Sequence, residues 1–335
     1  MKPSQLSSLL AVAIQAREPV LITGAPGIGK SDIVAQAAQT AGAEVVYFHG
    51  VTSDPTDIKG MPWITGHNGE TKADFVPFGD LLRLIKPSGP TLAFLDDLGQ
   101  APPLVQASFM QAVQARRVGE HKISDQVVFV AATNRKQDKA AVAGILEPVK
   151  SRFTIVSLEP DLDDWCRWAL NAGVPVEVVA FCRFRPECIV DYKPTADLTN
   201  SASPRTIHAA ARWIGKGLPA ALEFDVLAGT IGEGRAAELA GFLKVWRSLP
   251  NIDQILLNPD TAPVPNEEPA TLYALSGLLA RRATQGNFGA MVRYIGRLPR
   301  DHAVLTMKMA TQKAPEVMQT QGFIQWSVNN QDVLL

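Results

Sequence analysis

The sequence predicts an α/β protein, in which an αβα sandwich on a five-stranded parallel sheet is followed by a helical domain and a helical C-terminal region. Two observations predict this fold. In the first half of the 335-residue chain, short β-rich runs alternate with helical stretches, which is the pattern of a parallel sheet covered by helices. After residue 160 the strand signal stops, and the rest of the sequence is patterned as helices.

The elements of the expected sheet follow one another in order. Helices are expected at 6–16, 31–41 and 102–115, and strands at 19–23, 44–48, 92–95, 127–132 and 153–158. Pro102 starts the third helix, where the missing N–H of proline costs nothing. Residues 54–79 break the alternation with glycines, prolines and little periodicity, and such an insertion in a compact domain is usually functional or mobile.

The chain therefore divides into four expected regions. They are an αβα domain over 1–158 with an insert near 54–79, a helical domain over 159–249, a linker over 250–270 and a helical extension over 271–335. The linker is expected because residues 258–269 are rich in Pro, Asn and Glu. Four tryptophans are the expected core anchors of the helical domain: Trp165, Trp168, Trp213 and Trp246.

Composition and charge exclude several classes of protein. The formal net charge is −1, so the bulk electrostatics do not indicate nucleic acid or an anionic membrane as a partner. No apolar run approaches the roughly 20 residues of a membrane span, and the N-terminus lacks a signal-peptide pattern. The three cysteines form no CxxC pair and are expected to be reduced thiols. These features predict a cytoplasmic location.

A phosphate-binding loop follows the first expected strand. Residues 24–31 fit the pattern GxxxxGK[ST] at every fixed position. Glycines let backbone N–H groups converge on a phosphate, and the dipole of the helix that starts near Lys30 adds to the attraction. Lys30 is expected to bridge the β- and γ-phosphates of ATP, and the Ser31 hydroxyl to ligate Mg²⁺. The expected nucleotide-binding residues are Gly24, Ala25, Pro26, Gly27, Ile28, Gly29, Lys30, Ser31 and Asp32.

Two acidic residues end the third expected strand. Asp96 is expected to hold Mg²⁺ together with Ser31, and Asp97 stands where a general base would polarise the attacking water. Glutamate is usual at this second position, and aspartate is shorter by one methylene, about 1.5 Å of reach. Either slow hydrolysis or an adjusted position of the attacking water is therefore expected. The alternative is that Asp97 is a solvated acid that caps the next helix.

Three further residues distinguish among classes of nucleotide-binding protein. Asn134 ends the fourth expected strand, where an amide could contact both the γ-phosphate and the lytic water, and the alternative is a simple turn residue. Arg152 precedes the fifth strand and could reach the nucleotide of a neighbouring subunit as an arginine finger, or form a surface salt bridge. Arg205 follows a Ser203 cap and Pro204 at a helix start, from which it could touch the γ-phosphate, or be an ordinary helix-start arginine.

Together these segments resemble the AAA+ family of P-loop NTPases and, within it, the MoxR branch. The resemblance covers roughly residues 1–250 and is carried by 24–31, 54–60, 96–103, 131–134, 151–153 and 201–205. It implies a hexameric ring that hydrolyses ATP, with the helical domain as a lid, and that remodels or activates a protein client. It also implies a partner with a von Willebrand A domain. Trp63 and Ile64 in the insert would then grip a client, the alternative being that they fold onto the domain.

Two other functions compete with this interpretation. One is an AAA+ nucleic-acid motor or loader, which the neutral charge disfavours. The other is a scaffold that needs ATP for assembly but hydrolyses it slowly, which the aspartate at position 97 suggests. A small-molecule kinase is disfavoured because Asn134, Arg152 and Arg205 would have no role.

Overall fold

The computed structural model describes residues 1–67, 70–138, 144–190, 193, 197–249, 252–265 and 269–330. The chain forms two compact units, Met1–Pro160 and Asp161–Leu335, and each is described by itself. Among the helices of the described residues, none combines the length and the apolar character that crossing a bilayer would require.

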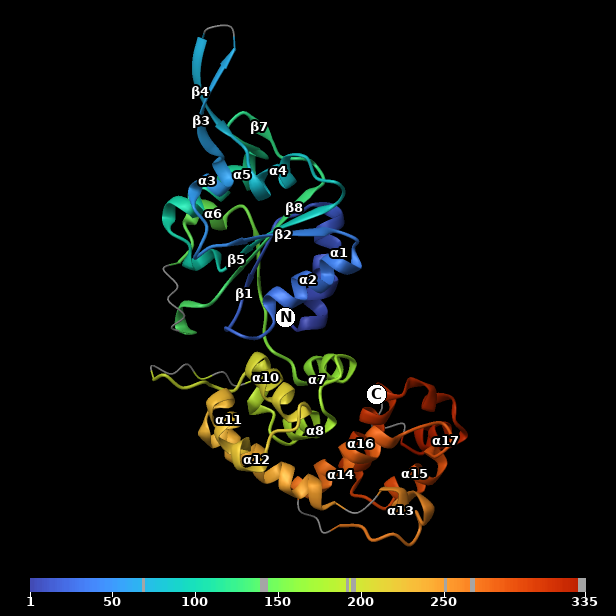
Figure 1. Ribbon diagram of the computed structural model, residues 1–335. Coiled ribbons are helices and arrows are strands. Elements are labelled where there is room, and N and C mark those ends of the chain that lie inside the picture. The colour runs from blue at the N-terminus through green and yellow to red at the C-terminus, as the bar shows by residue number, and fades with distance from the viewer. Residues whose placement is uncertain are drawn as a thin grey trace. The chain divides into compact units, whose positions relative to one another are not determined.

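The first unit is built on a five-stranded parallel sheet with the strand order β2-β5-β8-β1-β9 (Figure 1). The strands are β1 (Val20–Thr23), β2 (Glu44–His49), β5 (Thr91–Asp96), β8 (Val127–Thr133) and β9 (Thr154–Ser157). Every neighbouring pair in this sheet is parallel. The expected fold class is therefore confirmed, and the short strand β1, which leads into the phosphate loop, lies inside the sheet between β8 and β9.

Helices enclose this sheet. They are α1 (Pro3–Ala16), α2 (Lys30–Thr40), α4 (Gly79–Ile85), α5 (Pro103–Ala115) and α6 (Glu147–Lys150). All seven residues of β8 are buried, as expected for a parallel strand with both faces covered. On one face, Phe109 of α5 packs edge-on against Phe48 of β2, with ring centroids 5.5 Å apart, inside a cluster that also contains Leu81 of α4. Helices α1 and α2 lie side by side.

The insert over 54–79 is more regular than the sequence indicates. It forms the short helix α3 (Pro55–Lys59) and the antiparallel hairpin of β3 (Met61–His67) and β4 (Glu70–Val76), with Met61 opposite Val76. Residues 68 and 69 of the expected gripping loop lie outside the described residues. Trp63 is 66% exposed and Ile64 70%, so the alternative that they fold onto the domain is wrong. A second, small hairpin, β6 (Arg117–Val118) with β7 (His121–Lys122), follows α5.

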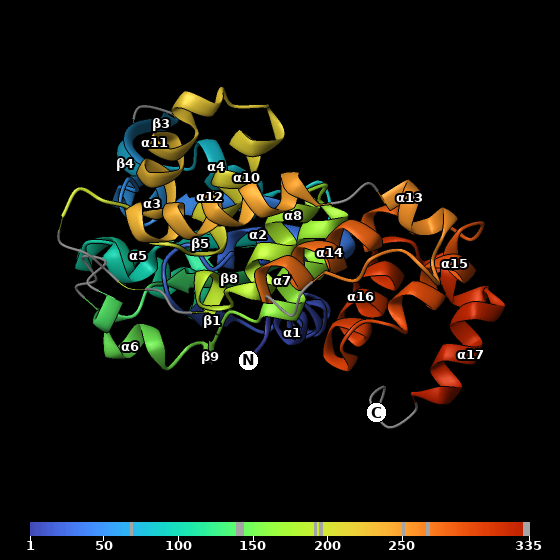
Figure 2. The ribbon, with the colours of Figure 1, turned by 90° about the horizontal axis from the view of Figure 1, so that it is seen from below.

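The second unit consists of helices around one hydrophobic core (Figure 2). The helices are α7 (Leu162–Asn171), α8 (Val176–Phe184), α9 (Glu187–Val190), α10 (Pro204–Gly215), α11 (Ala220–Ile231), α12 (Glu233–Ser248), α13 (Ile252–Leu257), α14 (Pro269–Arg282), α15 (Phe288–Ile295), α16 (Arg300–Lys313) and α17 (Gln321–Asn329). Helix α14 packs against both α8 and α16. The expected lid and C-terminal extension therefore share a core, and α13 occupies part of the expected linker, of which residues 250, 251 and 266–268 lie outside the described residues.

Two groups of side chains in this core bear on the sequence predictions. Trp165 is buried and Trp168 and Trp246 pack partly buried against the core, but Trp213 is 47% exposed, so its assignment as a core anchor was wrong. The three cysteines are free thiols and buried. Burial raises the pKa of Cys166 to about 11 and that of Cys188 to about 12, and it raises the pKa of Cys182 well above the ordinary value.

Candidate nucleotide site

The expected site residues gather at one edge of the sheet because the strands are parallel. The register pairs Thr23 with Thr133 and Leu95 with Ala131, so β1, β5 and β8 end at nearly the same level. The residues that follow these ends are Gly24, Asp97 and Asn134. Ligands of open α/β sheets bind at the carboxyl ends of the strands, so this edge is the candidate site.

The phosphate loop has the backbone that its glycines predict. Gly27 has φ 74° and Gly29 has φ 95°, both in the left-handed region that favours glycine. Helix α2 begins directly afterwards at Lys30, so its first N–H groups face the loop with the positive end of the helix dipole. This is the geometry of an anion-binding helix N-terminus. Asp32 lies in the first turn of α2 and is exposed, where a carboxylate interacts favourably with the helix dipole. Its part in nucleotide binding stays a prediction.

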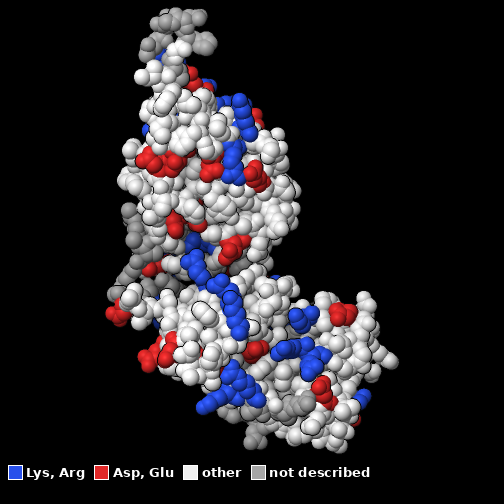
Figure 3. All heavy atoms as spheres, viewed as in Figure 1, with Lys and Arg blue, Asp and Glu red and all other residues white. Residues whose placement is uncertain are grey.

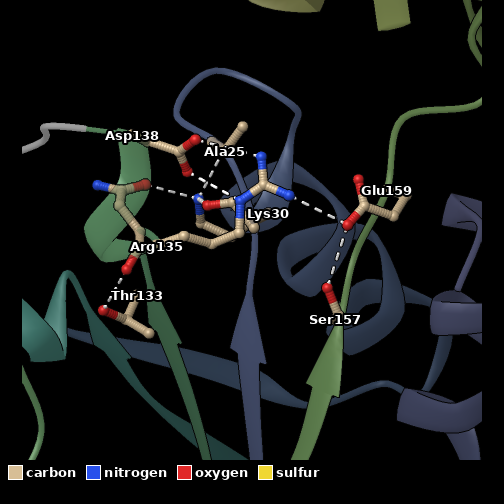
Figure 4. Close-up of polar contacts among 9 residues, drawn as sticks. Ala25, Lys30, Thr133, Arg135, Asp138, Ser157 and Glu159 are labelled. Atoms are coloured by element: carbon tan, nitrogen blue, oxygen red, sulfur yellow. Dashed lines mark hydrogen bonds and ion pairs between the residues drawn. The ribbon is translucent and has the colours of Figure 1, made fainter. Parts of the chain in front are cut away.

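Lys30 is held at the centre of the site (Figure 4). Its ammonium donates to the carbonyl oxygens of Gly24 and Ala25, both at 2.9 Å, and to Oδ1 of Asn134 at 2.8 Å. The residue is 7% exposed. An ammonium carries three hydrogens and no acceptor, so these three neutral oxygens fix its position and keep its positive charge within the phosphate loop.

A second set of contacts joins the two acids to this centre. The Ser31 hydroxyl donates to Oδ2 of Asp96 at 2.8 Å, which places two expected Mg²⁺ ligands side by side. The amide Nδ2 of Asn134 donates to Oδ1 of Asp97 at 3.1 Å. Asn134 therefore contacts Lys30 with one end of its amide and Asp97 with the other, so neither Asn134 nor Asp97 is the simple turn residue or solvated cap of the alternative interpretations.

Comparison with known families gives one assignment. Residues 19–153 match the family described as AAA domain (dynein-related subfamily). This part of the chain is an AAA domain. Comparison with curated proteins gives no match.

Solved structures that are similar to this chain include RuvB and NtrX. One is a mutant of RuvB from Thermotoga maritima, with 17% identity, 82% of this chain and 80% of that chain covered, and a TM-score of 0.44. Another is the Thermotoga maritima RuvB Holliday junction branch migration motor, with 17% identity, 83% and 80% covered, and a TM-score of 0.42. A third is NtrX from Brucella abortus, with 15% identity, 92% and 67% covered, and a TM-score of 0.41.

The two predicted arginines belong to different units of the chain. Arg152 follows α6 in the AAA domain, where its Nε donates to Oε1 of Gln114 on α5 at 2.8 Å and its Nη1 donates to the carbonyl of Pro148. Both acceptors are neutral, so these contacts are not the surface salt bridge of the alternative interpretation. Arg205 belongs to the second unit and is exposed in the first turn of α10. Its role toward a nucleotide stays a prediction.

The cap before Arg205 has the predicted form. Ser203 is the N-cap of α10, and its hydroxyl accepts a hydrogen bond from the backbone N–H of Thr206 at 3.3 Å. The Thr206 hydroxyl in turn accepts from the backbone N–H of Ser203 at 2.9 Å, which completes a capping box. Pro204 stands at the first helical position.

One arginine beside the phosphate loop was not predicted from the sequence. Arg135 follows Asn134, and its guanidinium pairs with both oxygens of Asp138, at 3.0 and 3.2 Å, and with Oε1 of Glu159 at 3.1 Å (Figure 4). Hydrogen bonding to Asp138 raises the pKa of Arg135 above its ordinary value. The available signal was its position directly after a strand-end asparagine, with an acid three residues later.

Proposed function

We propose that this chain hydrolyses ATP. The observation that carries the proposal is the continuous contact from Lys30 through Asn134 to Asp97, next to the Ser31–Asp96 pair. An AAA domain implies ATPase activity in general, and the loop geometry fits a triphosphate bound through backbone N–H groups and Lys30.

Mg²⁺ fits the donors that are present. A hydroxyl and a carboxylate, Ser31 and Asp96, are oxygen ligands of the kind that Mg²⁺ prefers, and the ion commonly takes its remaining ligands from water and phosphates. Bound there, it would offset the charge of the phosphates. Asp97 would accept a proton from the attacking water, and the Asn134 amide would fix the direction of its carboxylate. This defined position of Asp97 favours hydrolysis over the scaffold function.

We further propose that the subunits form a MoxR-type ring, expected to be a hexamer, with Arg152 acting on the neighbouring subunit's nucleotide. A surface salt bridge is disfavoured as its role because the guanidinium donates to the neutral oxygens of Gln114 and Pro148. Arg205 would couple the second unit to the nucleotide. The exposed Trp63 and Ile64 on the β3–β4 hairpin support a protein client, and the resemblance adds a von Willebrand A partner.

Mixed subunits test both the hydrolysis and the ring. Specific ATPase activity of the wild type should rise with protein concentration. Arg152→Ala should lower kcat about 10³-fold, as loss of an arginine finger does. A second, inactive Lys30→Met subunit keeps its own Arg152 and should restore activity when mixed with the Arg152→Ala subunit. Activity that is independent of concentration, with no rescue in the mixture, would contradict the ring.

A separate experiment distinguishes a protein client from nucleic acid. On the face shown in Figure 3, acidic and basic side chains are interspersed over the first unit, which does not favour a phosphate-backbone tract. We therefore expect no stimulation of ATPase by DNA or RNA at low salt. An Asp97→Asn variant, which should bind ATP without turning it over, is expected to retain the client in a pull-down, with Lys30→Met as the control that cannot bind ATP.

A further inference from the structure

Arg135 spans the end of the strand that carries the phosphate loop. Arg135 itself follows β8, and its partner Glu159 follows β9, while β1 lies between these two strands in the sheet. The Arg135–Glu159 pair therefore crosses the carboxyl end of β1, beside Lys30 and Ala25 in the view of Figure 4. This ion pair therefore links the ends of β8 and β9, the two strands on either side of β1 and its phosphate loop.

The two ends of this bridge differ in how firmly they are fixed. The Asp138 side chain is 6% exposed and binds Arg135 through both oxygens, so this end is a buried, two-point pair. Glu159 is 56% exposed, and its Oε1 also accepts from the Ser157 hydroxyl at 3.3 Å. The Arg135–Asp138 end is thus part of the fold, whereas the Glu159 end can open and close at small cost.

Arg135 and Glu159 each lie next to a residue or segment that matters for the proposed function. On the β8 side, Arg135 directly follows Asn134, whose amide contacts both Lys30 and Asp97. On the β9 side, Glu159 is followed by Pro160 and then by Asp161, with which the second unit begins. A displacement of Asn134 would therefore be passed by the Arg135 guanidinium to residues 159–161, which join the two units.

We propose that Arg135 is a positioning residue. Through Glu159, it couples Asn134 to residues 159–161, the segment that joins the two units. The proposal rests on the proposed ATPase function. Phosphate binding that shifts the Lys30–Asn134 contact would move residue 135, and the bridge to Glu159 would pass this movement to residues 159–161. In the reverse direction, a movement of the second unit would alter the orientation of Asn134 and hence turnover.

Glu159→Ala is the variant that tests this coupling. It removes the bridge but leaves the buried Arg135–Asp138 pair in place. The matched control is Glu44→Ala, which also removes one of two acids from an arginine. Arg83 of α4 binds Asp80 three residues away and the more distant Glu44 of β2, just as Arg135 binds Asp138 and Glu159. Glu44 is 44% exposed and begins β2, at the end of the sheet opposite the phosphate loop.

Steady-state kinetics give the first readout. Glu159→Ala is expected to lower kcat about tenfold with KM changed less than about twofold, whereas Glu44→Ala keeps both within about twofold. Arg135→Lys retains the charge but cannot bind both acids in the same fork and should fall between wild type and Glu159→Ala. An unchanged kcat in Glu159→Ala, with an active wild type, overturns the coupling and leaves the ATPase proposal intact. An inactive wild type that binds no ATP refutes the ATPase proposal and the coupling with it.

Hydrogen exchange gives a readout that does not depend on turnover. A non-hydrolysable ATP analogue should change the exchange of backbone amides at 157–165 in the wild type and in Glu44→Ala. The same analogue should bind Glu159→Ala with affinity within about threefold and leave this segment unchanged. Equal nucleotide-dependent changes in the wild type and Glu159→Ala, or no change in either, would overturn the proposal.

Discussion

Replacement of Gly24 by alanine tests how the phosphate loop is held. A Cβ added at Gly24 would lie 2.6 Å from Cδ1 of Ile28 and 2.8 Å from the carbonyl oxygen of Leu158. The Ile28 methyl is the end of a flexible side chain and can rotate away. The Leu158 oxygen cannot, because the backbone N–H of the same residue donates to the carbonyl of Thr23 at 2.8 Å and fixes its place beside β1.

The size of the effect follows from this contact. Ordinary van der Waals contact begins at 3.4 Å, so a carbon 2.8 Å from the Leu158 oxygen requires a displacement of 0.6 Å. Overpacking of this kind costs about 1–3 kcal/mol of folding free energy. For a unit of this size each kcal/mol lowers Tm by about 2–4 °C. Because Gly24 is the first residue of the phosphate loop, its displacement should also lower kcat/KM for ATP, by about tenfold, by analogy with the loss that a 1 Å misplacement causes.

Thermal unfolding and ATPase kinetics of Gly24→Ala measure both effects. Gly89→Ala is the control, because a Cβ there would meet no described atom within 4 Å, and its stability should stay within about 0.5 kcal/mol of the wild type. A Gly24→Ala protein with the Tm and kcat/KM of the wild type would refute the claim that the loop is packed against Leu158.

Further outcomes are expected at four residues. Lys30→Met should abolish the rise in Tm that ATP produces, which at about 100 times Kd corresponds to about 2.7 kcal/mol in the wild type and is read by thermal shift. Asp97→Glu should lower Tm without raising kcat, because glutamate is less favourable than aspartate in the left-handed backbone of this residue, and a higher kcat would contradict this. The Cys166 thiol, with its pKa raised to about 11, should resist a thiol reagent at pH 8 until the protein unfolds. Since the unfolded thiol ionises near pH 9 and the folded one does not, stability measured by denaturant unfolding should fall as pH rises from about 9 toward 11. Ser203→Ala should cost about 1 kcal/mol in the same assay, and no loss would contradict the capping box.

The phosphate site could be predicted because each of its parts is local. The glycine spacing of the loop, and the apolar runs that end in Asp96 and Asn134, are properties of single segments. Parallel strands then bring their ends together without any further information in the sequence. Arg135 was missed because its importance comes from Glu159, which is distant in the sequence and adjacent only in the folded sheet.

The β3–β4 hairpin could not be predicted by the same reasoning. A strand is recognised in a sequence when alternate residues are apolar, because one face of the strand is buried. Here Trp63 and Ile64 are neighbours on opposite faces and both are exposed, so no alternation results. Trp213 is the opposite case: Ile207, Ala210 and Ile214 mark the inner face of α10 at helical spacing, and position 213 falls off this face.

The aspartate at position 97 gains a physical explanation from its backbone. Asp97 has φ 53° and ψ 35°, a left-handed conformation that aspartate and asparagine adopt several-fold more readily than residues with longer side chains. The adjoining Gly50 shows how closely this turn is packed, since a Cβ there would lie 2.6 Å from the carbonyl oxygen of Asp97. The turn points a short carboxylate at the Asn134 amide, 3.1 Å away. The left-handed backbone therefore explains why a short acidic side chain suits position 97. The role of Asp97 as general base and the rate of hydrolysis that it supports stay predictions.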